Sequence, residues 1–298
     1  MDEIISIVKQ YFYFEIFDNW GMPILLLLII FLFIAETIWQ LRKRRISRWK
    51  RIKTNVGIAA TALFVLRVAL IPVLVMVAKR AEDAGIGLLN WADFPRWLVY
   101  LLGFFLLDYG NYLWHIINHR IPFLWRFHNV HHIDLDLDVT TAVRFHFGEV
   151  FLSVFFRGLI ILIIGAPYLL VLVYEIFFEA ATNFHHTNWR LRYKIEKVLS
   201  WFIVTPRMHG IHHSIVQRET NSNYSVIFNC WDRLHRTIRL NIRQDELNIG
   251  VPSYRDPKEQ TIKNLLLMPF RKQRPWQLPD GQIPERKDCR NRNSHLKV

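Results

Sequence analysis

Four long apolar stretches constrain the fold of this chain most strongly. They run approximately over Pro23–Trp39, Val56–Ala78, Arg96–Ile117 and Gly148–Phe184. The last stretch is interrupted by Gly165-Ala166-Pro167, which predicts a turn between two helices of about 17 residues each. Hydrophobic residues make up 52% of the chain, and runs of this length favour membrane spans over a soluble core. We therefore expect an all-α, multispanning transmembrane helix bundle in an integral membrane protein.

The distribution of basic residues predicts the orientation of this bundle. The segment Arg42–Lys53 contains eight basic residues and no acidic residue, and it directly follows the first apolar stretch. Such a flank is typical of the cytoplasmic side of a span. A membrane-facing surface explains the net charge of +13 better than a DNA groove, so we expect no nucleic-acid partner. The two cysteines, Cys230 and Cys289, form no disulfide framework and no metal-binding Cys pair.

Histidines supply the chemical signal. Eleven of the 13 histidines lie between positions 115 and 213, and a His-x-x-His-His motif occurs twice, with a His-x-x-x-His pair just ahead of the first copy. Histidines at i and i+4 share one helix face and can hold one ion together. Eight imidazoles in these clusters exceed the needs of one tetrahedral or octahedral ion, so the count predicts two ions. The expected topology places the clusters at one membrane face, as a helical metal-binding cap on the cytoplasmic side.

Imidazole suits iron, zinc and copper, so the ligand type alone does not identify the metal. The position of the clusters, where lipid chains end, favours oxidation of unactivated lipid C–H bonds by a redox metal, and iron fits this best. A zinc-dependent lipid hydrolase is an alternative, although a zinc pair would normally use carboxylates. A non-catalytic membrane metal-binding protein is a second alternative.

Several motifs resemble those of the fatty acid hydroxylase/sterol desaturase superfamily. The resemblance covers about Asp108 to Thr237. Its first segment is Asp108–His132, which includes Leu124-Trp125-Arg126-Phe127-His128. The other segments are Arg144-Phe145-His146, Thr187-Asn188, Asn223-Tyr224-Ser225 and Trp231-Asp232-Arg233-Leu234. It implies an integral membrane di-iron oxygenase that uses O₂ and external electrons to hydroxylate, desaturate or cleave a lipid such as a fatty acyl chain, sterol or ether lipid. The sequence shows no flavin, iron–sulfur or haem segment, so a separate reductase or electron carrier is expected.

The resemblance also implies a set of metal ligands. The matching histidines are His115, His119, His128, His131, His132, His186, His209, His212 and His213. His146 is a further candidate ligand, although Phe147 replaces the usual proline beside it, and a structural partnership with Glu149 is the alternative. His185 stays open as a ligand, an outer partner or neither, and His235 is interpreted as a packing histidine.

Ligating imidazoles need a carboxylate or carbonyl on their second nitrogen to fix the tautomer. The candidates in this sequence are Asp108, Glu149, Glu179, Asn188, Asn223 and Asp232. Of these we expect Glu149, Asp108 and Asn188 at the catalytic site, although the helical rise places Asp108 about 10 Å from His115 along a helix.

Further expectations concern organisation and packing. We expect an N-terminal two-span region (1–93), a catalytic domain (94–240) and a basic tail (241–298) that is loosely ordered from Val251, with an amphipathic interfacial helix over Leu191–Ile203. Equal depths in the bilayer predict the ion pairs Arg67–Asp108 and Arg157–Glu175. We also expect an apolar tunnel between the third span and the hairpin, which runs to the histidines and is lined by these residues: Tyr112, Phe151, Phe155, Phe178 and Phe184.

Overall fold

The computed structural model of the chain describes residue 14 and residues 16–286, and this part is helical with no β-strand. The expected all-α architecture is therefore confirmed. The principal helices are α2 (Met22–Ile38), α3 (Arg48–Val65), α4 (Ile71–Asp83), α5 (Arg96–Arg120), α6 (Pro122–His132), α7 (Phe147–Ile164), α8 (Tyr168–His186), α9 (Tyr193–Leu199), α10 (Pro206–His212), α11 (Gln217–Thr220), α12 (Cys230–Leu234) and α13 (Ile262–Leu267). Short π-helical turns η1 (Ile16–Gly21) and η2 (Leu66–Leu70) precede α2 and α4. Short 3₁₀ turns occur at η3 (Leu88–Asn90), η4 (Val139–Val143), η5 (Pro257–Glu259) and η6 (Met268–Phe270).

Three helical segments of the described chain are long and apolar enough to cross a membrane: Ile16–Ile38, Arg48–Asn90 and Phe147–Ile164. The second is longer than expected, because the basic residues from Arg48 onward form the first turns of α3 rather than a linker. Pro72 near the start of α4 has no N–H to donate to the preceding turn, and the π-helical turn η2 accommodates it. Helices α5 and α8 are of similar length but carry polar and histidine side chains.

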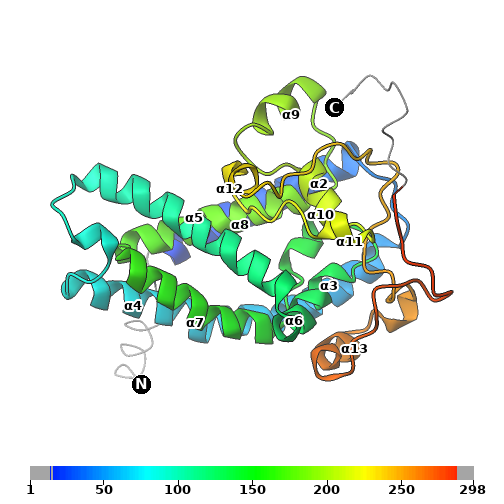
Figure 1. Cartoon of the computed structure of the whole chain (residues 1–298), viewed down its shortest axis with the longest axis horizontal. Coiled ribbons are helices and arrows are strands. Elements are labelled where there is room, and N and C mark those ends of the chain that lie inside the picture. Colours follow the sequence, from blue (N-terminus) through cyan, green and yellow to red (C-terminus); the bar gives the residue numbers. More distant parts are fainter. Residues whose placement is uncertain (1–13, 15, 287–298) are drawn as a thin grey trace.

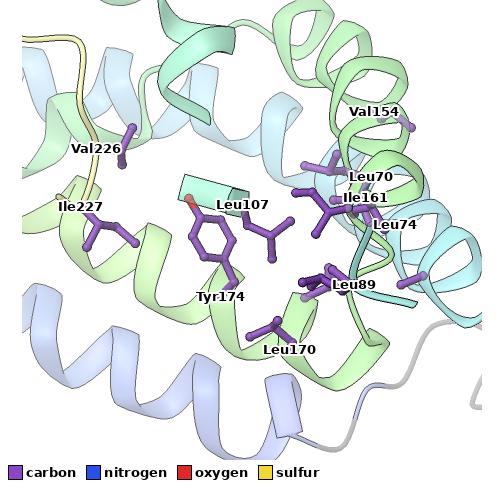
Figure 2. Packing of buried hydrophobic residues seen from close by; sticks show 14 residues of the cluster. Leu70, Leu74, Leu89, Leu107, Val154, Ile161, Leu170, Tyr174, Val226 and Ile227 are labelled. Carbon is purple, nitrogen blue, oxygen red and sulfur yellow. The ribbon is translucent and has the colours of Figure 1, made fainter. Parts of the chain in front are cut away.

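The long helices pack into an elongated bundle (Figure 1). α4 contacts α7 and α8, α5 contacts the same two helices, and α2 packs on α8. Figure 2 shows Leu107 of α5 between Tyr174 of α8 and Ile161 of α7 in the central hydrophobic cluster. The predicted turn between α7 and α8 is confirmed: Gly165 has a φ of +72°, and a Cβ there would lie 2.5 Å from the Ile86 carbonyl oxygen.

The charged residues within the bundle form one of the two predicted ion pairs. Arg157 of α7 pairs with Glu175 of α8, as predicted from their equal distance to the hairpin turn. The Arg67–Asp108 prediction is wrong, because Arg67 pairs at 2.9 Å with Asp18 of η1. Asp18 lies in the helical turn η1, which precedes the predicted start of the first span at Pro23.

The segment from Val251 to residue 286 packs against the helices, contrary to the expectation of a loose tail. Leu265 and Met268 pack in a cluster with Ile58 of α3 and Val130 of α6. Trp276 donates a hydrogen bond from its indole N–H to the Ile215 carbonyl at 2.9 Å. The C-terminal segment therefore covers the outer face of the helix that carries the first His-x-x-His-His motif.

Candidate metal centre

Four helices bring nine histidines together at one end of the bundle. They lie on the C-terminal turns of α5 and α8, on the second half of α6, and on α10, with His213 at the residue where α10 ends. They form two groups, whose potential ligand atoms lie within 4.8 Å of one another in each group: His115, His119, His128, His132 and His212 in the first, and His131, His186, His209 and His213 in the second. Nine of the ten predicted ligands are thus in positions from which they could hold a metal ion.

The two His-x-x-His-His motifs are shared between the groups in a reciprocal way. On α6, His128 and His132 belong to the first group, whereas His131 points to the second. On α10 the i, i+4 pair His209 and His213 belongs to the second group, whereas His212 between them belongs to the first group. Because residues three and four apart project at different angles from a helix, one motif can serve two neighbouring ions.

The two groups are adjacent. The ring centroids of His132 and His213, one from each group, are 4.4 Å apart and the rings are stacked. The centroids of His115 and His209 are 6.5 Å apart, although their positions differ by almost a hundred in the sequence. The arrangement is therefore one site with two compartments.

Outer hydrogen bonds fix the tautomers of several imidazoles. The Nδ1 atoms of His115, His186 and His212 each lie 2.7 Å from a backbone carbonyl oxygen, of Tyr224, Thr182 and Ser222 respectively. A carbonyl can only accept, so Nδ1 carries the proton and the Nε2 lone pair is free for a metal ion. Tyr224 belongs to one of the quoted sequence motifs, but no sequence pattern indicated these carbonyls as partners, because backbone groups leave no signal in the side-chain sequence.

The inner nitrogens fit a bound cation. Nε2 of His209 lies 2.9 Å from Nε2 of His186 and 3.1 Å from Nε2 of His213. In the first group, Nε2 of His119 and of His212 are buried without any hydrogen-bond partner among the described residues. Buried polar atoms without partners are costly, and convergent imidazole lone pairs are the donor set that Fe, Zn or Cu would satisfy.

Burial also maintains the ligands in the form that binds metal. Burial, together with the neighbouring imidazoles, holds the pKa of His131, His132, His209, His212 and His213 well below its ordinary value. These rings are therefore neutral at physiological pH, and neutral imidazole is the ligand form.

The tenth predicted ligand, His146, lies outside both groups. Its Nδ1 accepts a hydrogen bond from the Gly148 N–H at 2.9 Å and so caps α7, and its Nε2 lies 3.1 Å from the Leu266 carbonyl oxygen. Both ring nitrogens are therefore used by the backbone. His185 is also outside the groups, with Nδ1 3.2 Å from the Val226 carbonyl oxygen, although its ring centroid is 4.1 Å from that of His209.

Glu149 contacts a metal-group histidine, whereas the other two predicted catalytic residues do not. Its Oε1 lies 2.8 Å from Nδ1 of His128, and its Oε2 is buried without a hydrogen-bond partner. Asp108 accepts hydrogen bonds from the Trp231 indole at 2.8 Å and the Phe228 N–H at 3.1 Å, which anchors a loop to α5. Asn188 exchanges two hydrogen bonds of 2.8 Å with the backbone of Arg42.

A buried network of charges supports the first His-x-x-His-His motif. Arg51 of α3 contacts both carboxylate oxygens of Asp134 at 2.7 Å and one oxygen of Asp138 at 2.5 Å, and it reaches the Asp136 carbonyl at 3.0 Å. These acidic residues directly follow His132. The basic run was interpreted as a membrane flank, so this role was missed, although the alternating acids at 134, 136 and 138 were a visible signal for basic partners.

A mostly apolar cavity of about 140 Å³ lies against the histidine groups. His115, His128, His131, His186 and His209 line one part of it, and leucines of α3 and η2 line another. A cavity next to the histidines was predicted, but its lining differs, since Phe178 is the only one of the five predicted residues there. Phe151 and Phe155 project from the outer surface instead, with 48% and 64% of their area exposed.

Comparison with known proteins supports the interpretation of this site. The family model described as "Fatty acid hydroxylase" matches residues 100–237, which include every histidine of both groups. No solved structure matches the chain significantly.

Three curated relatives are lipid hydroxylases or monooxygenases by name. The chain is 31% identical to the ornithine lipid hydroxylase of Rhizobium tropici over 54% of this chain and 48% of that protein. It is 28% identical to alkylglycerol monooxygenase of Xenopus tropicalis over 50% and 32% of the two chains, and 24% identical to cholesterol 25-hydroxylase of Rattus norvegicus over 55% of each. The chain thus spans about half or less of the length of these relatives. Residues 100–237, which carry the histidine motifs that converge in the fold, therefore match the fatty acid hydroxylase family.

Proposed function

We propose that this protein is a membrane-bound di-iron oxygenase that uses O₂ and external electrons to hydroxylate a lipid. One observation carries the proposal: nine imidazoles, seven of them buried and two half-buried, form two adjacent groups at the wall of an apolar cavity. The names of the relatives support a lipid as substrate. The imidazole-only donor set speaks against a zinc-dependent hydrolase, for which carboxylate ligands are usual.

The chain's own residues hold and shield the reaction site in this proposal. The two histidine groups would hold one iron ion each, and iron would supply the activation of O₂ needed for an unactivated C–H bond. Glu149 orients the imidazole of His128, and the Thr182, Ser222 and Tyr224 carbonyls orient three others. The apolar cavity aligns a lipid chain beside the histidines and excludes water. A separate reductase supplies electrons, because monooxygenation reduces the second oxygen atom to water.

We further propose that the metal centre lies on the cytoplasmic side of the membrane. The basic run of 42–53 lies at the same end of the bundle as the histidines, because Arg42 contacts the Thr187 and Pro206 carbonyls next to the second group. An excess of Lys and Arg is typical of the cytoplasmic flank.

Oxygen-isotope labelling tests the proposed activity. Membranes that contain the iron-loaded protein would be supplied with a reductase system and heavy-oxygen-labelled O₂, and their lipids analysed by mass spectrometry. The proposal predicts a lipid that gains one labelled oxygen atom, with loss of the product in His209→Ala. The matched control is His235→Ala, since His235 lies outside both groups and stacks on Tyr109 and Tyr112. Iron-loaded protein that produces no labelled lipid would contradict the activity, and cleavage of an ester by zinc-loaded protein would favour the hydrolase.

A further inference from the structure

The cavity beside the histidines contains a carboxyl group that the metal centre does not use. Two acidic side chains, Glu149 and Glu179, line it. Glu149 bonds to His128, whereas the Glu179 side chain forms no hydrogen bond and no ion pair with any residue that the structure describes. The Asn183 amide that lies near it donates to its backbone carbonyl, at 2.8 Å.

Arg157 acts electrostatically on Glu179 but forms no ion pair with it. Arg157 also lines the cavity, but its guanidinium pairs with Glu175, one helical turn before Glu179 on α8. The same guanidinium lies 5.1 Å from the centroid of the Phe178 ring. The Arg157 guanidinium is therefore engaged by Glu175, and the Glu179 carboxyl lines the cavity without a hydrogen bond or ion pair to any described residue.

Glu179 is half-buried, and a carboxyl that lines an apolar cavity without a protein partner loses part of its hydration, which is costly unless a ligand supplies hydrogen bonds. The hydrocarbon part of the wall includes Ala62, Leu63, Leu66, Leu70, Val150 and Phe178. The polar residues Asn111, Asn118 and Ser153 also line the cavity, but their side chains donate hydrogen bonds within the protein. A hydrocarbon wall would suit a plain acyl chain better if a leucine stood at position 179. The polar side chain thus indicates a ligand that brings its own hydrogen-bond donor.

The position of Glu179 on α8 sets the geometry of such a ligand. Glu179 precedes His186 by seven residues, so the two lie on the same helix face about 10 Å apart along the axis. A molecule that bonds to Glu179 at one point can extend along this face toward the histidine groups. The carbon that meets the histidines would then lie several bonds from the polar group.

We propose that Glu179 is the polar anchor of the lipid cavity and accepts a hydrogen bond from a hydroxyl or amine group carried by the lipid. The inference rests on the proposed function in taking a lipid as the occupant, and it deepens it by naming the functional group. Glu179 is on this account a specificity-determining residue, because it discriminates against a hydrocarbon chain that lacks a donor.

Photocrosslinking tests the anchor without requiring turnover. The full-length, iron-loaded protein in detergent would be labelled with a diazirine-bearing long-chain alcohol, or with the methyl ether of the same alcohol, which cannot donate. Labelling of cavity-lining peptides would be quantified by mass spectrometry. One hydrogen bond to a carboxylate predicts an alcohol preference of about tenfold or more. Glu179→Leu should abolish the preference, whereas Glu179→Gln, which keeps an accepting oxygen, should retain most of it.

Phe178→Leu is the matched control, because it changes the shape of the same cavity and should alter the labelling by both probes equally. Equal labelling by alcohol and ether in the unmodified protein would overturn the proposal, as would an undiminished preference in Glu179→Leu with its iron retained. If Glu179→Leu does not fold, Glu179→Ala replaces it under the same criterion. An alcohol preference without any oxygenated product would support the anchor and contradict the proposed activity. An oxygenated product without any alcohol preference would support the activity and contradict the anchor.

Discussion

His128 depends on Glu149 for its orientation, because the 2.8 Å contact fixes which imidazole nitrogen faces the first histidine group. Outer partners of ligating histidines typically contribute 10–100-fold to metal affinity. We predict that Glu149→Gln weakens iron binding in the first group by about this factor and leaves the second group intact. Competition with a chelator measures this effect. Glu179→Gln is the control, since its carboxyl lies in the same cavity without touching a histidine, and an equal loss of iron in both variants would contradict the assigned role.

Arg51 stabilises the loop behind the first His-x-x-His-His motif. Burial alone would raise the pKa of Asp134, but the Arg51 and Arg144 guanidinium groups outweigh it and hold that pKa below its usual range. Arg51→Met leaves two buried carboxylates without their main partner, and we predict a loss of about 3–5 kcal/mol in the free energy of unfolding.

Arg243→Met provides the control for this effect. Arg243 also pairs with an aspartate, at 2.6 Å, but its side chain is 73% exposed and that of Asp245 is 65% exposed. Solvent screens such a pair, so we expect no measurable change in the free energy of unfolding of Arg243→Met. Detergent-titration unfolding compares the two variants, and equal stabilities would show that the buried network contributes nothing.

The short helix α9 has its apolar side facing outward. The buried residue of this short helix is an acid, Glu196, which pairs with Arg207 at 2.6 Å. Val198, and Trp201 and Phe202 just after the helix, are 60%, 64% and 65% exposed. Sequence periodicity predicted an interfacial helix over Leu191–Ile203, and the regular helix covers only the central part of that range. An exposed apolar face next to lysines is typical of a segment that lies in a membrane interface.

Spin labelling tests this placement. In a background with Cys230 and Cys289 replaced by Ser, a label at Phe202→Cys in reconstituted vesicles should be more accessible to dissolved O₂ than to a water-soluble nickel complex. A label at Arg243→Cys should show the opposite preference. If both labels are equally accessible to the nickel complex, α9 does not contact the bilayer.

In the whole molecule, the features that the sequence predicts correctly are mainly those whose signal is local. The i, i+4 spacing of His115 and His119 and the Gly165 turn depend on a few neighbouring residues, and the structure has both the shared face and the turn. The division of each His-x-x-His-His motif between two groups depends on how α6 and α10 face each other. No local pattern contains that information.

Long-range contacts explain the other differences between the sequence-based predictions and the structure. Arg42 and Arg51 were interpreted as solvated membrane-flanking charges, yet they are 8% and 5% exposed. Their partners lie 83 or more positions away along the chain. The part of the chain before residue 100, which the family match does not cover, therefore supplies side chains that brace the loops next to the histidine groups.

The metal content of the purified protein tests the central claim most directly. Elemental analysis with Mössbauer spectroscopy on protein produced in iron-supplemented cells should give two iron ions per chain that are magnetically coupled, because the two histidine groups are adjacent. His119→Ala and His213→Ala, which each remove one ligand from a different group, should each lower the content toward one ion. A single ion per chain, or zinc in place of iron at full occupancy, would contradict the account.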